Sequence, residues 1–376
     1  MTQFLSDKIN ERVLTNSLRE LKFNEDHLID FSSNDYLGFA HSNLLKTKLI
    51  EELSIHKNYT LGSTGSRLIS GNTQYIEELE SCIAKYHQAE TGLIFNSGYD
   101  ANIGLLSSIA NRNDTYICDE LIHASLIDGV RLSKANKFTF KHNNLLSLEE
   151  KLRLAKGNIF VITESVFSMD GDFAPLNQMV ALVNKYQANL IVDEAHATGV
   201  IGEKGEGLVQ KLGLQNEVFA RVITFGKAIG SHGAIVLGSQ LLKTYLINFA
   251  RSFIYTTAPS FHNLAIVKNA YQYLPQAEEI KQLQNLIAYF NSKIKDIHQL
   301  FINSESAIQS LLVSGNLECK ATAKRIRDKG FNVKAILSPT VPIGKERIRI
   351  CLHAYNTKEE IDVMVEAIRK AKTMLS

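Results

Sequence analysis

Between residues 92 and 238, short apolar runs alternate with amphipathic helical patterns, and this alternation restricts the fold more than any other feature. Strands that are separated by helices at this spacing form a mainly parallel sheet with helices on both faces. We therefore predict an α/β fold, in which ligands bind at the carboxyl ends of the strands. The runs of strand length are Gly92–Phe95, Thr115–Cys118, a short run near Phe138, Ile159–Thr163, Asn189–Val192, Val222–Thr224 and Gly233–Leu237.

The flanking segments predict elements around this sheet. Residues 1–25 predict a helix, with Leu14, Leu18 and Leu21 at helical spacing, and residues 73–88 form a clear amphipathic helical pattern. We expect an N-terminal helical arm and strand over 1–40, a large α/β domain over 41–260 and a smaller α+β domain over 261–376. The remaining expected elements are helices over 176–187 and 261–300, strands at Ile29 and near Leu311, Val333 and Ile348, and helix-starting capping boxes at Ser147–Glu150 and Thr357–Glu360.

Composition excludes several classes of partner. With 376 residues, the chain is long enough for roughly two domains. A formal net charge of +2 gives no reason to expect nucleic acid or an acidic membrane surface. The four cysteines and 11 histidines show no zinc-ligand spacing, so we expect reduced thiols and no metal. Neither a signal-peptide core nor an apolar run near ~20 residues is present, which favours a cytoplasmic protein.

Two strand ends suggest a cofactor. Lys227 follows one apolar run and lies between Gly226 and Ala228, whose small size lets a large group approach. The segment Asp193–His196 follows another run. Pyridoxal phosphate (PLP) needs a lysine for its Schiff base, a carboxylate at its pyridine nitrogen, donors for its phosphate and a face for its ring. Taken alone, Lys227 would be a surface lysine and Asp193 a helix N-cap.

Other strand ends supply the remaining groups. The turn Ser97–Tyr99 offers backbone N–H groups and a positive helix end to a phosphate. Ser168 and Thr224 add hydroxyls, His123 could stack on the ring, and His196 could reach its phenolic oxygen. Each signal is weak alone. Their common position at strand ends predicts one PLP pocket.

A glycine-rich stretch, Leu61–Gly71, allows two interpretations. It is either a flexible surface loop or, because Arg67 and several hydroxyls lie in it, a site for an anionic ligand. The sequence favours neither.

The chain resembles the α-oxoamine synthases, a branch of the fold-type I PLP enzymes, from about Phe31 to the C-terminus. The resemblance implies that enzyme fold, a homodimer and an active site at the interface between subunits. The motifs that carry it are Ser33–Gly38, Asn96–Asn102, Asp119–Ser125, Glu164–Asp172, Asp193–Gly199 and Thr224–Lys227.

The resemblance also implies roles at the cofactor. Lys227 is the Schiff-base lysine and proton-transfer base, Asp193 faces the pyridine nitrogen, and His123 stacks over the ring. His196 lies at the phenolic oxygen. The other implied cofactor contacts are Gly98, Tyr99, Ser168 and Thr224, with Thr256 and Thr257 directed to the neighbouring subunit's cofactor.

Members of this family condense an amino acid with an acyl thioester and release carbon dioxide and the free thiol. The resemblance implies Arg349 as the carboxylate clamp, with Asn34, Arg19 and Thr340 as further substrate contacts. The Gly62–Arg67 loop and Ser338–Pro342 are most like members that join L-alanine to a pimeloyl thioester. Three alternatives remain. The protein could condense glycine with acetyl-CoA, it could catalyse another reaction of the family, or it could bind PLP without catalysis. The sequence does not distinguish CoA from a carrier protein.

Overall fold

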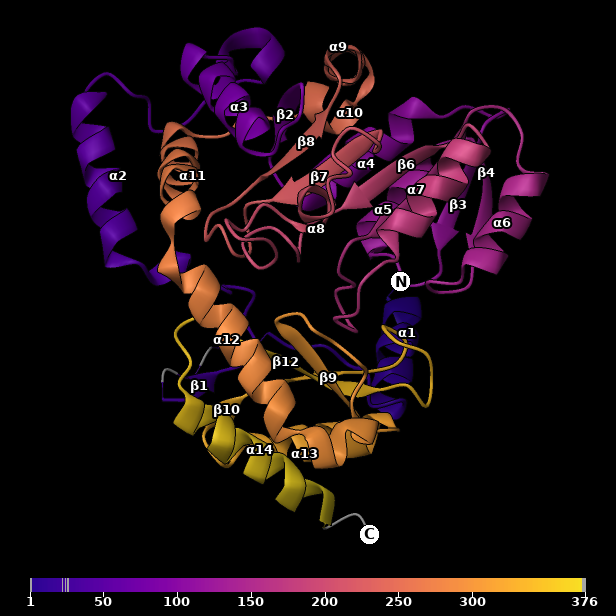
Figure 1. Ribbon diagram of the computed structural model, residues 1–376, viewed down its shortest axis with the longest axis vertical. Coiled ribbons are helices and arrows are strands. Elements are labelled where there is room, and N and C mark those ends of the chain that lie inside the picture. The colour runs from indigo at the N-terminus through magenta and orange to yellow at the C-terminus, as the bar shows by residue number, and fades with distance from the viewer. Residues whose placement is uncertain (1, 22, 24, 26, 374–376) are drawn as a thin grey trace. The chain divides into compact units, whose positions relative to one another are not determined.

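A seven-stranded sheet is the main element of the computed structural model, which describes residues 2–21, 23, 25 and 27–373. Its strand order is β2-β8-β7-β6-β5-β3-β4 (Figure 1). β8 pairs antiparallel with β2 and β7, and the other neighbours pair parallel. The predicted mainly parallel sheet is confirmed. The strands are β2 Thr91–Phe95, β3 Thr115–Asp119, β4 Asn136–Phe140, β5 Ile159–Glu164, β6 Asn189–Asp193, β7 Ala220–Thr224 and β8 Ala234–Gly238.

Burial explains why these runs become strands. Ile117, Val161 and Ile191 have no exposed surface, as expected for strands that are covered on both faces. Helix α4 packs on β2, β7 and β8, while α6 packs on β3 and β4 and α7 on β6. The helices of this part are α2 Asn43–Ile55, α3 Gln74–Tyr86, α4 Gly98–Ile109, α5 Ala124–Leu132, α6 Leu145–Leu154, α7 Leu176–Lys185, α8 Leu208–Lys211, α9 Gln240–Phe249, α10 Arg251–Ile254 and α11 Phe261–Tyr273.

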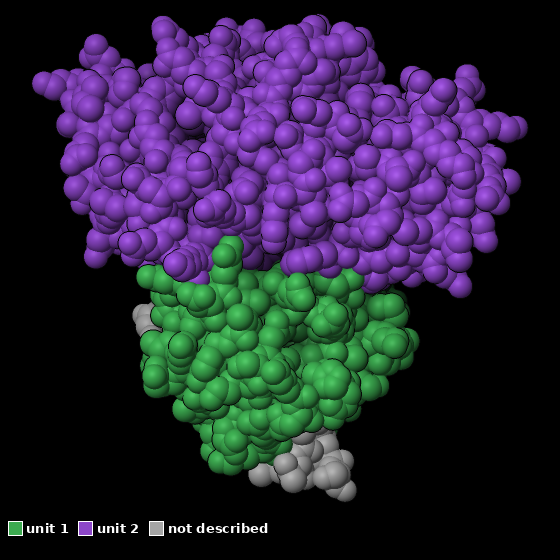
Figure 2. Space-filling view, in the orientation of Figure 1, with its two compact units in different colours: residues 1–34, 168–172, 282–376 green, residues 35–167, 173–281 purple. Residues whose placement is uncertain are grey.

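The chain packs into two units, coloured in Figure 2. The larger unit contains the sheet and consists of residues 35–167 and 173–281. The smaller unit consists of residues 1–34, 168–172 and 282–376. The predicted division into an arm and strand over 1–40, a large domain over 41–260 and a small domain over 261–376 stays a prediction. No helix among the described residues is long and apolar enough to cross a membrane.

The smaller unit has a three-stranded antiparallel sheet and a short parallel pair. The sheet order is β11-β12-β9, and β1 pairs with β10. Strands occur near Leu311, Val333 and Ile348, where the sequence predicted them. The elements are α1 Gln3–Leu14, β1 Ile29–Asp30, α12 Glu278–Lys293, which begins in the larger unit, β9 Ile308–Leu312, α13 Asn316–Arg327, β10 Phe331–Asn332, β11 Lys334–Ile336, β12 Arg347–Cys351 and α14 Lys358–Thr373.

The N-terminal helix is shorter than predicted. Helix α1 ends at Leu14, and Asn16 has a left-handed backbone with a φ of 53°, which terminates it. Leu14 is 82% exposed and Leu21 106% exposed, so the spacing of these leucines marks no buried face in this chain. The prediction that the helix continues past Leu14 was wrong.

The start of α6 also differs from the prediction. Asn144 is the N-cap, and its side chain accepts a hydrogen bond from the Ser147 N–H at 2.8 Å. The Ser147 hydroxyl instead accepts from the Lys141 N–H at 3.1 Å. The predicted capping box at Ser147 was therefore wrong by one helical turn.

The capping box of α14 is confirmed and supports a stability prediction. The Thr357 N–H donates to Glu360 Oε2 at 2.9 Å, and the Glu360 N–H donates to Thr357 Oγ1 at 3.1 Å. Thr357→Ala should lower the free energy of unfolding by ~1 kcal/mol, because the helix loses one acceptor. Urea unfolding followed by circular dichroism measures the change. Thr47→Ala, at an exposed position within α2, is the control and should leave the midpoint unchanged.

Candidate active site

One edge of the large sheet collects the predicted cofactor residues. Because β8 is antiparallel to both β2 and β7, those two strands run in the same direction, and β3, β5 and β6 share it. Their carboxyl ends therefore lie at one edge. Asp193 is the last residue of β6, and Gly98, His123 and Lys227 follow β2, β3 and β7 within a few residues. This is the edge at which ligands bind in such sheets.

Lys227 lies in the turn after β7 and is half-buried. Its Nζ is 2.7 Å from Nε2 of His196, and the Tyr36 hydroxyl is 2.7 Å from Nδ1 of the same ring. Tyr36 has no exposed surface. The imidazole of His196 therefore connects a buried phenol to the lysine amine.

This connection links the proton on Lys227 to the tautomer of His196. A lysine ammonium can only donate, so a neutral His196 that accepts at Nε2 carries its proton on Nδ1. A neutral Lys227 amine can accept from an Nε2–H, and Tyr36 can then donate to Nδ1. The network can hold Lys227 in either protonation state, as a group that moves a proton requires.

Asp193 ends β6 and is 6% exposed. Its Oδ1 accepts from the Ala195 N–H at 2.9 Å, and its Oδ2 accepts from Asn102 Nδ2 at 2.8 Å. Turns rather than a helix follow Asp193, so the alternative interpretation as a helix N-cap was wrong. A buried, doubly hydrogen-bonded carboxylate at a strand end suits an electrostatic role.

His123 is the N-cap of α5, and its Nδ1 accepts from the Ser125 N–H at 3.2 Å. The Ser125 hydroxyl is 2.8 Å from the same nitrogen. The ring is exposed in the single chain. Surrounding protein still reduces its access to water, and this lowers the pKa of His123, while Asp193 opposes the shift and Lys227 reinforces it. A neutral imidazole is favoured.

The start of α4 offers backbone donors. Ser97 is the N-cap, and its hydroxyl accepts from the Asp100 N–H at 3.0 Å. The first N–H groups of a helix, here those of Gly98 and Tyr99, have no partner inside it. A Cβ placed on Gly98 would lie 3.5 Å from Thr224 Oγ1, so the glycine lies against the threonine. This helix end and hydroxyl can bind a phosphate.

Thr256 and Thr257 lie next to the same turn. Asn96, which directly follows β2, donates from Nδ2 to Thr256 Oγ1 at 2.9 Å and to the Thr257 carbonyl at 2.8 Å. The structure therefore brings both threonines to the residues that precede Gly98.

The glycine-rich stretch contains a buried ion-pair network. Arg67 is 9% exposed; it pairs with Glu80, and its Nε donates to Asn72 Oδ1 at 2.9 Å. Glu80 also accepts from Lys243 at 2.8 Å and from the Ile94 N–H at 2.8 Å. Arg67 therefore holds the stretch against α3 through Glu80 rather than serving an anionic ligand.

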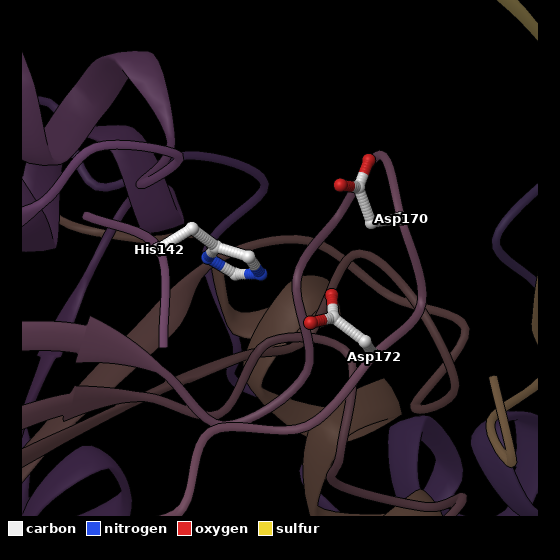
Figure 3. A group of neighbouring side chains, drawn as sticks. All are labelled: His142, Asp170 and Asp172. Atoms are coloured by element: carbon white, nitrogen blue, oxygen red, sulfur yellow. The ribbon is translucent and has the colours of Figure 1, made fainter. Parts of the chain in front are cut away.

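In the smaller unit, Arg349 on β12 is only 6% exposed, whereas without the family resemblance an arginine on a strand would be interpreted as an exposed side chain. Its Nη2 donates to Asn34 Oδ1 at 2.9 Å, and its Nε donates to the Ser168 carbonyl at 2.8 Å. Three residues expected at the active site are thus in contact. Arg347, two positions earlier on the same strand, pairs with Asp170, one of the side chains drawn in Figure 3.

Arg19 and Thr340 lie together in the smaller unit. Both are exposed, and Arg19 Nη2 donates to Thr340 Oγ1 at 3.1 Å. Although 321 positions separate them, the structure brings these two expected substrate contacts into one pair.

Sequence reasoning missed four residues that bond to the expected site: Tyr36, Asn96, Asn102 and Ser125. All four lie inside the motifs that carried the family resemblance. The motifs therefore contained the signal, but no residue type or spacing showed what each side chain would contact.

The larger unit fits PLP by the chemistry of its groups. It has a lysine amine, a buried carboxylate, an exposed imidazole face and a glycine at a helix N-terminus. These match the four requirements of the cofactor. Lys227 supplies the amine, Asp193 the carboxylate, His123 a face for the ring and Gly98 a donor for the phosphate.

Residues 26–368 match the family Aminotransferase class I and II, and the chain belongs to this family. Two similar curated proteins are 8-amino-7-oxononanoate synthases. That of Emericella nidulans is 42% identical, with 95% of each chain covered. That of Lysinibacillus sphaericus is 39% identical, with 96% of this chain and 95% of the relative covered.

Solved structures agree. An 8-amino-7-oxononanoate synthase from Francisella tularensis has a TM-score of 0.80 and 28% identity, covering 94% of this chain and 100% of its own. A serine palmitoyltransferase from Sphingomonas wittichii has a TM-score of 0.89 at 24% identity, covering 99% and 97%, and shows the fold alone. The predicted fold type I class and the resemblance to α-oxoamine synthases are confirmed.

Proposed function

We propose that this protein uses PLP to condense L-alanine with a pimeloyl thioester, forming 8-amino-7-oxononanoate, carbon dioxide and the free thiol for biotin biosynthesis. Relatives that carry this enzyme name are 36–42% identical over most of the chain. The observation that carries the proposal is the Lys227–His196 contact of 2.7 Å at the same sheet edge as the buried Asp193.

PLP, when bound, accepts the electrons left at the amino acid's α carbon once its proton is removed. With PLP bound, Lys227 would hold the cofactor through its amine, and that amine, once the amino group of the substrate has displaced it, would take the α-proton as general base. His196 exchanges tautomers as Lys227 gains or loses its proton. Asp193 supplies the negative charge that keeps the ring nitrogen protonated.

The remaining cofactor residues hold the phosphate and the ring. The N–H groups of Gly98 and Tyr99 and the hydroxyl of Thr224 bind the phosphate, because a helix N-terminus attracts an anion. His123 covers one face of the ring. We also assign cofactor contacts to Ser168 and, on the neighbouring subunit's cofactor, to Thr256 and Thr257.

The smaller unit supplies substrate groups. Arg349 binds the carboxylate of alanine, and Asn34 orients the guanidinium through the bond of 2.9 Å. Arg19 and Thr340 bind the acyl substrate. The α carbon forms a bond to the thioester carbonyl carbon, the thiolate departs, and the carboxylate then leaves as carbon dioxide.

The assembly and location are part of the proposal. We propose a cytoplasmic homodimer with its active site at the interface between subunits, acting on CoA or carrier-protein thioesters and without nucleic-acid or membrane partners. The exposed ring of His123 in the single chain is consistent with a neighbouring subunit completing the site. Size-exclusion chromatography with light scattering measures the oligomeric state.

Two assays test the function. Borohydride reduction should fix PLP on Lys227, and peptide mapping locates it; a protein that cannot be loaded with PLP contradicts the cofactor assignment.

Thiol release should be faster with pimeloyl-CoA and L-alanine than with acetyl-CoA and glycine. A preference for the second pair would select glycine C-acetyltransferase activity. A loaded protein that turns over neither pair, nor another acyl thioester, would be a PLP-binding protein without this catalysis.

A further inference from the structure

We propose that Asn102 is a positioning residue that fixes both Asp193 and the tautomer of His123, an inference that rests on the proposed function of this site. Asn102 is 2% exposed and lies on α4. Its Nδ2 is 2.8 Å from Asp193 Oδ2 and 2.9 Å from Ser125 Oγ. One amide nitrogen thus contacts both Asp193 and Ser125, the residue that bonds to His123.

The orientation of the Asn102 amide follows from its neighbour. A carboxylate only accepts hydrogen bonds, so the atom facing Asp193 must be the nitrogen and not the oxygen. An amide nitrogen has two protons. The two distances use both, one for Asp193 and one for Ser125.

Ser125 passes this constraint to His123. The Ser125 oxygen accepts from Asn102, so its single proton is directed to His123 Nδ1 at 2.8 Å. The Ser125 backbone N–H donates to the same nitrogen at 3.2 Å. Two donors directed at Nδ1 require its lone pair, and a neutral His123 therefore carries its proton on Nε2.

Packing allows Asn102 to reach this position. A Cβ on Gly129 of α5 would lie 2.9 Å from the Asn102 carbonyl oxygen, so only a glycine permits this approach of α4 and α5. The Asn102 Oδ1 is buried and has no hydrogen-bond partner in the described protein. An unpaired buried acceptor is unusual in proteins. The asparagine is therefore better explained by the two hydrogen bonds that its amide nitrogen donates.

The consequence is a neutral His123 that can donate from Nε2 while Asp193 stays a fixed acceptor. The lowered pKa of His123 is consistent with this arrangement. Asn102 and Ser125 thus set the charge state of the ring that covers the cofactor, without contacting the reacting atoms themselves.

Histidine-selective ¹⁵N labelling of the full-length protein tests the assignment, since the ring nitrogens respond to which of them is protonated. Spectra are recorded at neutral pH before and after PLP is added, and His123 is identified from the signals missing in His123→Asn. We expect the Nε2–H form in the wild type. In Ser125→Ala, the Nδ1–H fraction should rise roughly fivefold to tenfold, because one donor to Nδ1 is lost.

A second variant tests the contact with Asp193. Asn102→Leu keeps a similar volume and removes both donor protons, so PLP affinity, measured by fluorescence titration, should fall about tenfold. Ser108→Ala, on the same helix with its hydroxyl bonded to the Gly104 carbonyl at 2.7 Å, is the matched control and should change neither result.

The outcomes separate this inference from the proposed function, because neither measurement requires turnover. A wild-type His123 that is doubly protonated or carries its proton on Nδ1 at neutral pH overturns the proposal. So does a Ser125→Ala protein with an unchanged tautomer. If Asn102→Leu fails to fold, the Ser125→Ala spectra decide the question alone.

Discussion

Replacing Lys227 with arginine is expected to lower kcat/KM about 10⁴-fold, although the positive charge is kept. Arginine stays protonated in proteins, so it can neither accept the α-proton nor attack the cofactor's aldehyde. General-base catalysis contributes up to about 10⁴-fold in enzymes. A steady-state thiol-release assay on the PLP-supplemented variant measures the loss.

Comparing the arginine variant with Lys227→Ala shows whether Lys227 acts as a base and nucleophile or only as a positive charge. If Lys227 acted only as a positive charge near His196, Lys227→Arg would keep most of the activity and Lys227→Ala would lose it. We expect both variants to be equally inactive and Lys204→Ala, at an exposed lysine of the same unit, to be fully active. Methylamine should partly restore Lys227→Ala, because a small amine can replace the missing base.

The pattern of strands made much of the cofactor site predictable. Residues that follow parallel strands must reach one edge of the sheet, so the positions after β2, β3, β6 and β7 could be grouped before any distance was known. The roles of Lys227 and Asp193 follow from residue type once this grouping is made. Local sequence was sufficient to group these residues, because the pairing of the strands determines where their carboxyl ends lie.

Contacts that depend on packing were not predictable. Asn102 is one polar residue within α4, and nothing in its spacing shows that it faces Asp193, 91 positions away. Arg67 in a glycine-rich stretch suited an anion as well as an internal partner, since only the packing of α3 brings Glu80 to it. The helical spacing of Leu14 and Leu21 shows which side chains share a face, but not whether any surface covers that face.

A second large effect, on stability, is expected at the buried pair formed by Arg221 and Glu194, the residue that directly follows Asp193. Arg221 on β7 is 1% exposed and Glu194 has no exposed surface. Their closest charged atoms, Nη1 and Oε2, are 3.8 Å apart, and Glu194 Oε1 accepts from the Val209 N–H at 2.9 Å. Burial raises the pKa of Glu194, and Arg221 opposes that shift.

Arg221→Met should destabilise the protein by about 3–5 kcal/mol, because it leaves a buried carboxylate without its positive partner. Urea unfolding at neutral pH measures the loss. The double variant Arg221→Met with Glu194→Gln should be more stable than the single variant, since the uncompensated charge is removed. Arg153→Met, which removes an exposed partner of Glu149, is the control and should have no measurable effect.

The pH dependence identifies the charge as the cause. Without Arg221 the pKa of Glu194 rises further in the folded state, while its unfolded value is unchanged. A carboxyl with a raised folded pKa contributes its full stability below the unfolded pKa and loses it as pH rises through the folded pKa. The stability gap between Arg221→Met and the wild type should therefore narrow as pH falls from neutral towards about 5. A gap that is constant with pH would mean that lost packing, rather than the unpaired carboxylate, destabilises the variant.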